Sequence, residues 1–225
     1  MQKNSVTSYK NVVFDLDGTI CDTRKGICDC IKYTFKTNGI KEPKDSEILK
    51  YIGSPISTIF GNLLITNNIS LILKYVRFFR KKYNQEGLLK TFLFPNVMEL
   101  LDHLKKSEIK VFLVTNKPKV FTLKILKMFG INQFFDGIYG SSISQIQPNK
   151  SRILNKLIND KHLAANETVM VGDRKDDIIA AKNNKIDSVG VTYGYGTISE
   201  LNSCNADYYC RDVLSVKNIL IKKFD

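Results

Sequence analysis

The sequence is poor in several residue types that mark common classes of protein. Its 225 residues include no tryptophan and only two histidines. No hydrophobic run approaches the roughly 18 residues that a membrane-spanning helix needs. The opening segment, MQKNSVTSYK, is polar and lacks the apolar core of a secretory signal, so we expect a cytoplasmic protein. No GxxxxGK[ST] run is present, which excludes a P-loop nucleotide enzyme.

Cysteine is sparse and irregularly placed. The five cysteines are odd in number, and no CxxC pair or finger-like spacing of cysteine and histidine occurs. The pattern therefore indicates neither a disulfide framework nor a zinc site, and we expect free thiols. The histidines, His103 and His162, lie on stretches with a helical pattern and are interpreted as surface or packing residues.

Positive charge is in excess. The chain has 34 lysines and arginines against 22 aspartates and glutamates, for a formal net charge of +12. This excess fits either attraction of an anionic substrate or polymer, or simply a lysine-rich solvated surface. The basic residues are spread along the chain, so nucleic acid is not the favoured partner. The densest stretch, VRFFRKKY (76–83), predicts a helix with one apolar face and a basic face toward solvent.

Hydrophobic segments alternate with helical patterns through most of the chain. Buried strands are predicted at 11–15, 110–115, 136–141, 168–173 and 187–194, and helices at 95–108, 118–130, 150–160 and 176–185. Strands that alternate with helices predict a parallel sheet wound by right-handed crossovers. The expected fold class is therefore α/β, with a doubly wound, Rossmann-like parallel sheet.

A helical region interrupts this alternation after the first strand. Residues 22–90 read as helix upon helix and show no convincing strand alternation. The economical model is a small all-helical domain of residues 22–90, inserted into an α/β core domain of residues 1–21 and 91–225. Linkers are expected near residues 20–24 and 87–95.

Polar residues close several predicted strands, and a lysine opens the helix that leads to the fourth. These residues are Asp15, Asp17, Gly18, Thr115, Asn116, Lys150, Asp173 and Asp177. Ligands of open parallel sheets bind at the carboxyl ends of the strands, so we expect these side chains to share one cleft. A lone aspartate at a strand end is often only a turn former or a helix cap, but the joint occurrence favours a common site.

Several carboxylates in one cleft would repel each other strongly unless a divalent cation lay among them. Magnesium fits, because it takes few protein carboxylates and completes its shell with water and phosphate oxygens. The predicted ligands are Asp15, Asp173 and the main-chain carbonyl of Asp17. The Thr115 hydroxyl, backbone amides and a lysine would hold the other phosphate oxygens. The set predicts a phosphoryl-transfer site.

These residues resemble the motifs of the haloacid-dehalogenase-like phosphohydrolases, and the resemblance covers essentially the whole chain. DLDGT (15–19), the threonine of FLVTN (112–116), the lysine that opens KSRIL and the GDRKDD run (172–177) follow the order of the four family motifs. Residues 22–90 resemble the small helical cap of the phosphoglycolate-phosphatase-like branch. GSPI (53–56) and VGVTYGYGTISEL (189–201) are also similar to segments of that branch.

The resemblance implies a role for each motif residue. Asp15 would be the nucleophile that forms an aspartyl-phosphate, and Asp17 the general acid and base, whose presence favours phosphate esters over dehalogenation. The implied sets are catalytic Asp15, Asp17, Thr115 and Lys150; substrate-binding Gly18, Thr115, Asn116 and Lys150; and metal-binding Asp15, Asp17, Asp173 and Asp177, with Mg²⁺ as the cofactor.

Two motif assignments have alternatives. Many relatives place the third-motif lysine directly before a proline, which would put Gln147 at that position, but Lys150 is preferred. Asp177 fits the fourth motif better than Asp176, and it either holds Lys150 or reaches the metal through water. Arg174 stands where threonine or serine is frequent in the family.

The leading prediction is a magnesium-dependent phosphatase, monomer or homodimer, that acts on a small phosphorylated metabolite and has no membrane partner. A phosphomutase is the second reading, although its relatives often follow DxDG with valine, and Thr19 is found here. The third is a phosphate- or nucleic-acid-binding module that has lost turnover, although no key residue is missing. Phosphoglycolate, nucleoside monophosphates, pyrophosphate and phosphotyrosine all remain open as substrates.

Overall fold

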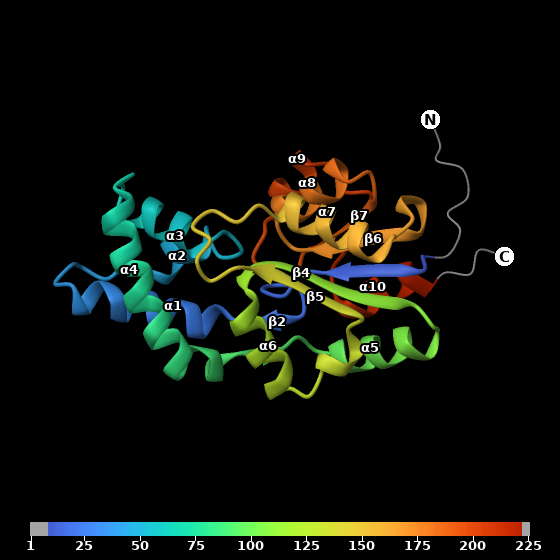
Figure 1. Ribbon diagram of the computed structural model, residues 1–225, viewed down its shortest axis with the longest axis horizontal. Helices are drawn as coiled ribbons and strands as arrows, with labels where there is room; N and C mark the ends of the chain where they lie inside the picture. Colours follow the sequence, from blue (N-terminus) through green and yellow to red (C-terminus); the bar gives the residue numbers. More distant parts are fainter. Residues whose placement is uncertain (1–8, 222–225) are drawn as a thin grey trace.

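The computed structural model describes residues 9–221 and has a parallel sheet at its centre (Figure 1). The strand order is β5–β4–β1–β6–β7–β8, and all neighbouring pairs are parallel. The strands are β1 (Asn11–Phe14), β4 (Lys110–Pro118), β5 (Gly137–Ser141), β6 (Thr168–Gly172), β7 (Asp187–Val191) and β8 (Tyr208–Cys210). The predicted α/β class is confirmed. Strand β8 was not predicted, because three residues are too few to show a period.

Helices cover both faces of the sheet. In Figure 1, α7, α8 and α9 lie above it, and α5, α6 and α10 lie below it. Their bounds are α5 (Val97–Lys106), α6 (Lys119–Met128), α7 (Lys150–Lys161), α8 (Lys175–Asn183), α9 (Ile198–Ser203) and α10 (Val213–Ile221), with short turns η3 (Asn132–Phe134) and η4 (Ala165–Glu167). This is the doubly wound arrangement that the sequence predicts.

The central strand β1 shows how the two layers are held. Its four residues are all buried, as expected for a parallel strand covered on both faces. Val13 packs in one cluster with Leu154 of α7 and Ala181 of α8. Val12 and Phe14 point the other way, into the cluster that contains α5, α6 and α10. The strand is therefore fixed from both sides, and the residue that follows it emerges at a defined point.

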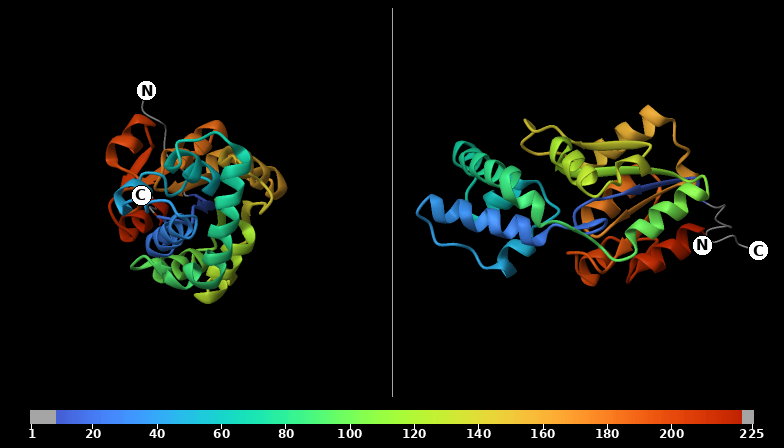
Figure 2. Two further views of the ribbon diagram at one scale, coloured as in Figure 1. Left: turned by 90° about the vertical axis from the view of Figure 1, so that its left-hand side faces the viewer. Right: turned by 90° about the horizontal axis from the view of Figure 1, so that it is seen from below.

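Residues 24–90, called the helical lobe below, lie beyond the carboxyl ends of the strands (Figure 2). The lobe contains α1 (Arg24–Thr37), α2 (Asp45–Leu49), α3 (Ile56–Leu63), α4 (Ile69–Lys82), the π-helical turn η1 (Tyr83–Gly87) and η2 (Leu88–Lys90). The segments that lead into and out of it, β2 (Cys21–Asp22) and β3 (Phe92–Leu93), pair antiparallel. They lie where the sequence predicts linkers. The domain boundaries at residues 22 and 90 stay a prediction.

Aromatic side chains form the centre of the lobe. The rings of Phe35, Phe60, Tyr75 and Phe79 are buried. The Phe60 ring centroid lies 6.2 Å from that of Phe35, 5.7 Å from Tyr75 and 6.0 Å from Phe79. Helices α1, α3 and α4 are thus joined through one residue.

Within residues 9–221, no helix combines the length and the apolar character needed to cross a bilayer. The five cysteines are free thiols.

We predict that Phe60→Ala lowers the free energy of unfolding by about 3–5 kcal/mol, because it removes a fully buried ring from the centre of the lobe. Leu89→Ala is the matched control in the same lobe: its side chain is 70% exposed, and a change within about 0.5 kcal/mol is expected. Urea denaturation followed by circular dichroism measures both. Equal effects of the two substitutions would contradict the packing described.

Candidate active site

Three buried carboxylates meet at the carboxyl edge of the sheet. Asp15 directly follows β1, Asp173 directly follows β6, and Asp177 lies in the first turn of α8. One oxygen from each of the three lies within 4.8 Å of the others. The fold therefore brings together residues that are as many as 162 positions apart in the chain.

Lys150, the first residue of α7, is the cation within this cluster. Its Nζ lies 2.6 Å from Oδ1 of Asp177 and 3.1 Å from Oδ1 of Asp15, and its side chain is 2% exposed. Burial alone would lower the pKa of Lys150, but the two carboxylates outweigh it and raise the pKa. Gln147, the alternative, is exposed. The geometry favours Lys150 as the third-motif residue.

Asp177 is held in a fixed position by two donors. Besides Lys150, the backbone N–H of Arg174 donates to Oδ2 of Asp177 at 3.0 Å, which caps α8. The neighbouring Asp176 is only half-buried and lies outside the carboxylate cluster. Of the two roles expected for Asp177, holding Lys150 is the one that the geometry displays.

Asp173 is positioned by a loop and a glycine. The N–H of Tyr195 donates to its Oδ2 at 2.8 Å, and the hydroxyl of Thr19 donates to its Oδ1 at 3.2 Å. Gly18 has φ of +91°, and a Cβ there would overlap the Asp173 carboxylate. The Gly18 N–H itself donates to the Cys21 carbonyl at 2.9 Å. In this arrangement, Gly18 allows the Asp173 carboxylate to lie close to the backbone. Its N–H is already bonded to Cys21 and is not free to bind a substrate.

The charge balance of the cluster fits a divalent cation. Burial raises the pKa of Asp173 to about 7, and the nearby Asp177 adds to this. Burial also raises the pKa of Asp15; Lys150 opposes the shift and the neighbouring carboxylates reinforce it. Oδ1 of Asp15 is buried, lies 3.1 Å from Nζ of Lys150 and has no further hydrogen-bond partner among the described residues. Three buried carboxylates with a single lysine among them form the kind of oxygen-rich site that hard divalent cations bind.

Asp17 lies apart from the three clustered carboxylates. Its Oδ1 and Oδ2 lie 2.9 and 3.0 Å from Nζ of Lys117, and both side chains are largely buried. Burial lowers the pKa of Lys117, but Asp17 and Tyr83 together outweigh this effect and raise the pKa. From the sequence alone, Lys117 fits equally well a residue that attracts an anionic substrate or a solvated residue at the start of a helix. Its position directly after the strand-ending Thr115 and Asn116 was the signal for a closer role.

Thr115 and Asn116 lie at the same edge of the sheet, and both are buried. The Thr115 hydroxyl accepts a hydrogen bond from the Lys117 N–H at 3.2 Å. The side-chain amide of Asn116 donates to the carbonyl of Gly53 in the helical lobe at 3.3 Å, and its Oδ1 accepts no hydrogen bond. An unpartnered acceptor at this place is available to a bound molecule.

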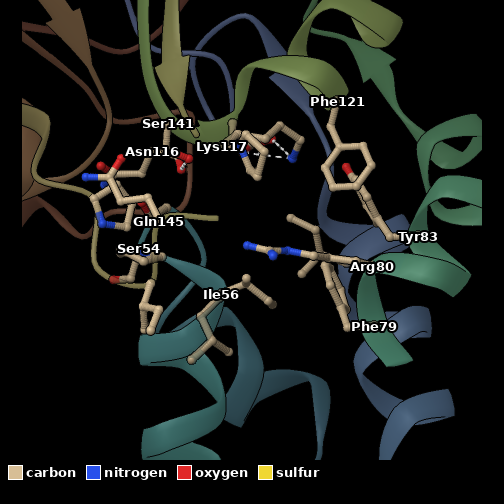
Figure 3. A pocket seen from close by; sticks show the side chains of 18 residues that line it. Ser54, Ile56, Phe79, Arg80, Tyr83, Asn116, Lys117, Phe121, Ser141 and Gln145 are labelled. Carbon is tan, nitrogen blue, oxygen red and sulfur yellow. Dashed lines mark hydrogen bonds and ion pairs between the residues drawn. The ribbon is translucent and has the colours of Figure 1, made fainter. Parts of the chain in front are cut away.

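A cavity lies between this edge of the sheet and the helical lobe (Figure 3). Asp17, Asn116 and Lys117 border it from the sheet side, and residues of α3, α4 and η1 border it from the lobe. The lobe side is mainly apolar, with Ile56 and Phe79 among its residues. The cavity therefore borders Asp17, which lies two residues along the chain from Asp15.

Arg174 joins the two parts of the molecule, a role that the sequence did not reveal. Its Nε donates to Glu200 at 2.9 Å, and its Nη2 donates to the Lys50 carbonyl in the lobe at 3.0 Å. Its Nη1 also donates to the Ile52 carbonyl. A threonine or serine at this position could not span these groups.

Comparison with known proteins gives consistent matches. Residues 12–191 match the model of the haloacid dehalogenase-like hydrolase family. A phosphoglycolate phosphatase from Vibrio parahaemolyticus is 32% identical, over 88% of this chain and 90% of its own length. A 5'-nucleotidase from Pseudomonas aeruginosa is 29% identical, over 97% of this chain and 98% of its own length.

Solved structures agree. A predicted phosphatase from Clostridium acetobutylicum superposes with a TM-score of 0.89 at 29% identity, covering 94% of this chain and 98% of that one. A haloacid dehalogenase-like family hydrolase from Streptococcus pneumoniae gives a TM-score of 0.84 at 29% identity, covering 92% of this chain and 96% of that one.

The raised pKa of Asp173 gives a prediction for the metal-free protein. The folded state binds the Asp173 proton more tightly than the unfolded state does. Below the unfolded pKa of 3.8, Asp173 therefore does not reduce the free energy of unfolding. As the pH rises to about 7 the free energy of unfolding falls progressively, and above that pH the reduction is constant. Asp173→Asn should therefore gain stability relative to the native chain across this window, by about 1.4 kcal/mol for each pH unit between the unfolded and the folded pKa. Urea midpoints measured in EDTA between pH 4.5 and 8 test this. A difference between the two proteins that does not grow with pH would contradict it.

Proposed function

Because the chain belongs to the haloacid dehalogenase-like hydrolase family, we propose that it is a magnesium-dependent phosphatase that hydrolyses a small phosphomonoester. The observation that carries the proposal is the placement of Asp15. Its carboxylate is buried beside Lys150 and two further carboxylates, and Lys150, 3.1 Å from Oδ1, is the one cation that contacts it among residues 9–221. A nucleophilic carboxylate has to stay ionised, and a nearby positive charge favours that form.

In the proposed reaction, a carboxylate oxygen of Asp15 attacks phosphorus, and the bond from phosphorus to the leaving oxygen breaks. The product is an aspartyl-phosphate on Asp15 and a leaving group that takes up a proton. Water then attacks phosphorus, which releases inorganic phosphate and restores the Asp15 carboxylate. Lys150 keeps Asp15 ionised and offsets the charge that builds on the transferred group.

Asp17 is proposed as the group that gives the proton to the leaving oxygen and later accepts one from water. Its carboxylate is two residues from Asp15 but is turned toward the cavity, where Lys117 contacts both oxygens. For Asp17 to hold a proton, Lys117 has to release one of these oxygens. The presence of a leaving group at the cavity edge is the event that can separate them.

Asp15, Asp173 and the Asp17 carbonyl would hold Mg²⁺, with Asp177 acting through Lys150 or a water molecule. The ion supplies charge neutralisation at the phosphate oxygens. Thr115 would bind another phosphate oxygen through its hydroxyl, and Asn116 through its side chain. The helical lobe, acting as a cap, excludes water and admits the leaving group, and the contacts from Arg174 and Asn116 to lobe carbonyls support this closed arrangement.

We predict that Asp15→Asn lowers the rate of phosphate release from p-nitrophenyl phosphate by about 10³-fold or more, since an amide oxygen is a poor nucleophile. Asp176→Asn removes the same charge from a carboxylate outside the cluster, and should retain activity within about threefold. The assay is colorimetric release of p-nitrophenol with MgCl₂ present. Substantial activity in Asp15→Asn would rule out the proposed nucleophile.

Magnesium should also stabilise the fold. Because Mg²⁺ relieves the repulsion among Asp15, Asp173 and Asp177, millimolar MgCl₂ is expected to raise the thermal midpoint by several degrees in the native chain. In Asp173→Asn, MgCl₂ should not raise the thermal midpoint. In the native protein, addition of EDTA should abolish phosphate release. An equal thermal shift in the variant, or activity that survives EDTA, would count against the metal site.

A further inference from the structure

The cavity beside the active site contains one cation that the proposed reaction does not use. Arg80 lies near the end of α4, and its guanidinium projects into the space between Ile56 and Lys117 (Figure 3). Nη1 of Arg80 donates to the carbonyl of Ile143 at 2.6 Å. Its Nε is buried and has no hydrogen-bond partner.

No carboxylate within residues 9–221 forms an ion pair with Arg80. The other cation of the cavity, Lys117, is neutralised by Asp17 at 2.9 Å. The charged residues that line the cavity therefore leave one positive charge uncompensated, next to an apolar wall that includes Phe79 and Phe121. A half-buried guanidinium without a negatively charged partner is unfavourable, and burial lowers the pKa of Arg80.

The size of the cavity restricts what can supply the missing charge. The volume open to water-sized molecules is about 60 Å³, which is room for about four waters. A leaving group of a few heavy atoms fills this space, whereas a nucleoside is larger and would extend beyond it. A carboxylate is the compact anion that matches the planar, two-donor edge of a guanidinium.

We propose that Arg80 is a specificity-determining residue that binds an anionic group on the substrate's leaving group, and that the preferred substrates are short phosphomonoesters with a carboxylate. This inference rests on the proposed phosphatase function. The inference adds to the proposed function a residue of the lobe and a class of substrate. It also separates two activities found among the relatives, since a 5'-nucleotide lacks a carboxylate and has a bulky leaving group.

The test compares two substrates that differ in the anionic group: 2-phosphoglycolate, and ethylene glycol monophosphate, in which the carboxylate is replaced by hydroxymethyl. In Arg80→Gln, kcat/KM for phosphoglycolate should fall by about 10- to 100-fold, the range for a lost charge-assisted hydrogen bond. For the uncharged analogue the fall should be at most about threefold. Arg80→Lys keeps the positive charge but loses the two-donor edge of the guanidinium. Its kcat/KM for phosphoglycolate should lie between those of the native protein and Arg80→Gln.

Arg77→Gln is the matched control. It removes the same charge from the same helix at an exposed position, and should leave the ratio of the two kcat/KM values unchanged. Equal losses for both substrates in Arg80→Gln would show a structural role and overturn the inference. So would a native enzyme that does not prefer phosphoglycolate over ethylene glycol monophosphate and adenosine 5'-monophosphate.

A binding measurement separates this inference from the proposed function. 3-Phosphonopropionate cannot be hydrolysed and carries the carboxylate, whereas propylphosphonate lacks it. The first should raise the thermal midpoint of the native protein more than the second, and the difference should disappear in Arg80→Gln but persist in Arg77→Gln. Equal shifts overturn the role of Arg80. A protein that shows the expected shifts but hydrolyses no phosphomonoester would overturn the phosphatase proposal alone.

Discussion

The contact between Lys150 and the buried carboxylates is the interaction on which the site depends. Asp15, Asp173 and Asp177 are all buried, and the charge of Asp177 helps to raise the pKa of both Asp15 and Asp173. Lys150 lies 2.6 and 3.1 Å from two of them and compensates part of this charge. The proposed divalent cation would neutralise the remaining negative charge, so its binding should also stabilise this edge of the sheet.

The fold could be read from the sequence where the pattern was strong. Strand β1 is a continuous apolar run closed by Asp15, and the helices after it show clear periods, so the parallel sheet and its order of elements followed. The short elements could not be read: β8 and the paired linkers β2 and β3 contain two or three residues each. Such strands form because neighbouring chain is held in place, which is a tertiary effect.

The site was predictable to the same degree. Strand ends indicated that Asp15, Thr115 and Asp173 would meet, since parallel strands end at one edge. The partners that orient them could not be predicted, because they come from loops and from the lobe. The sequence left the role of Lys117 open and marked Arg174 only as unusual for its motif position, and only the folded structure shows what each contacts.

The pairing of β2 with β3 has a mechanical consequence. The two strands that connect the lobe to the sheet are hydrogen-bonded to each other, and the Phe94 N–H extends the contact to the Ile20 carbonyl at 3.1 Å. Two separate tethers would let the lobe twist as well as swing. A hydrogen-bonded pair of strands resists torsion more than bending, so any movement of the lobe would bring the same lobe residues back to the same place beside the sheet.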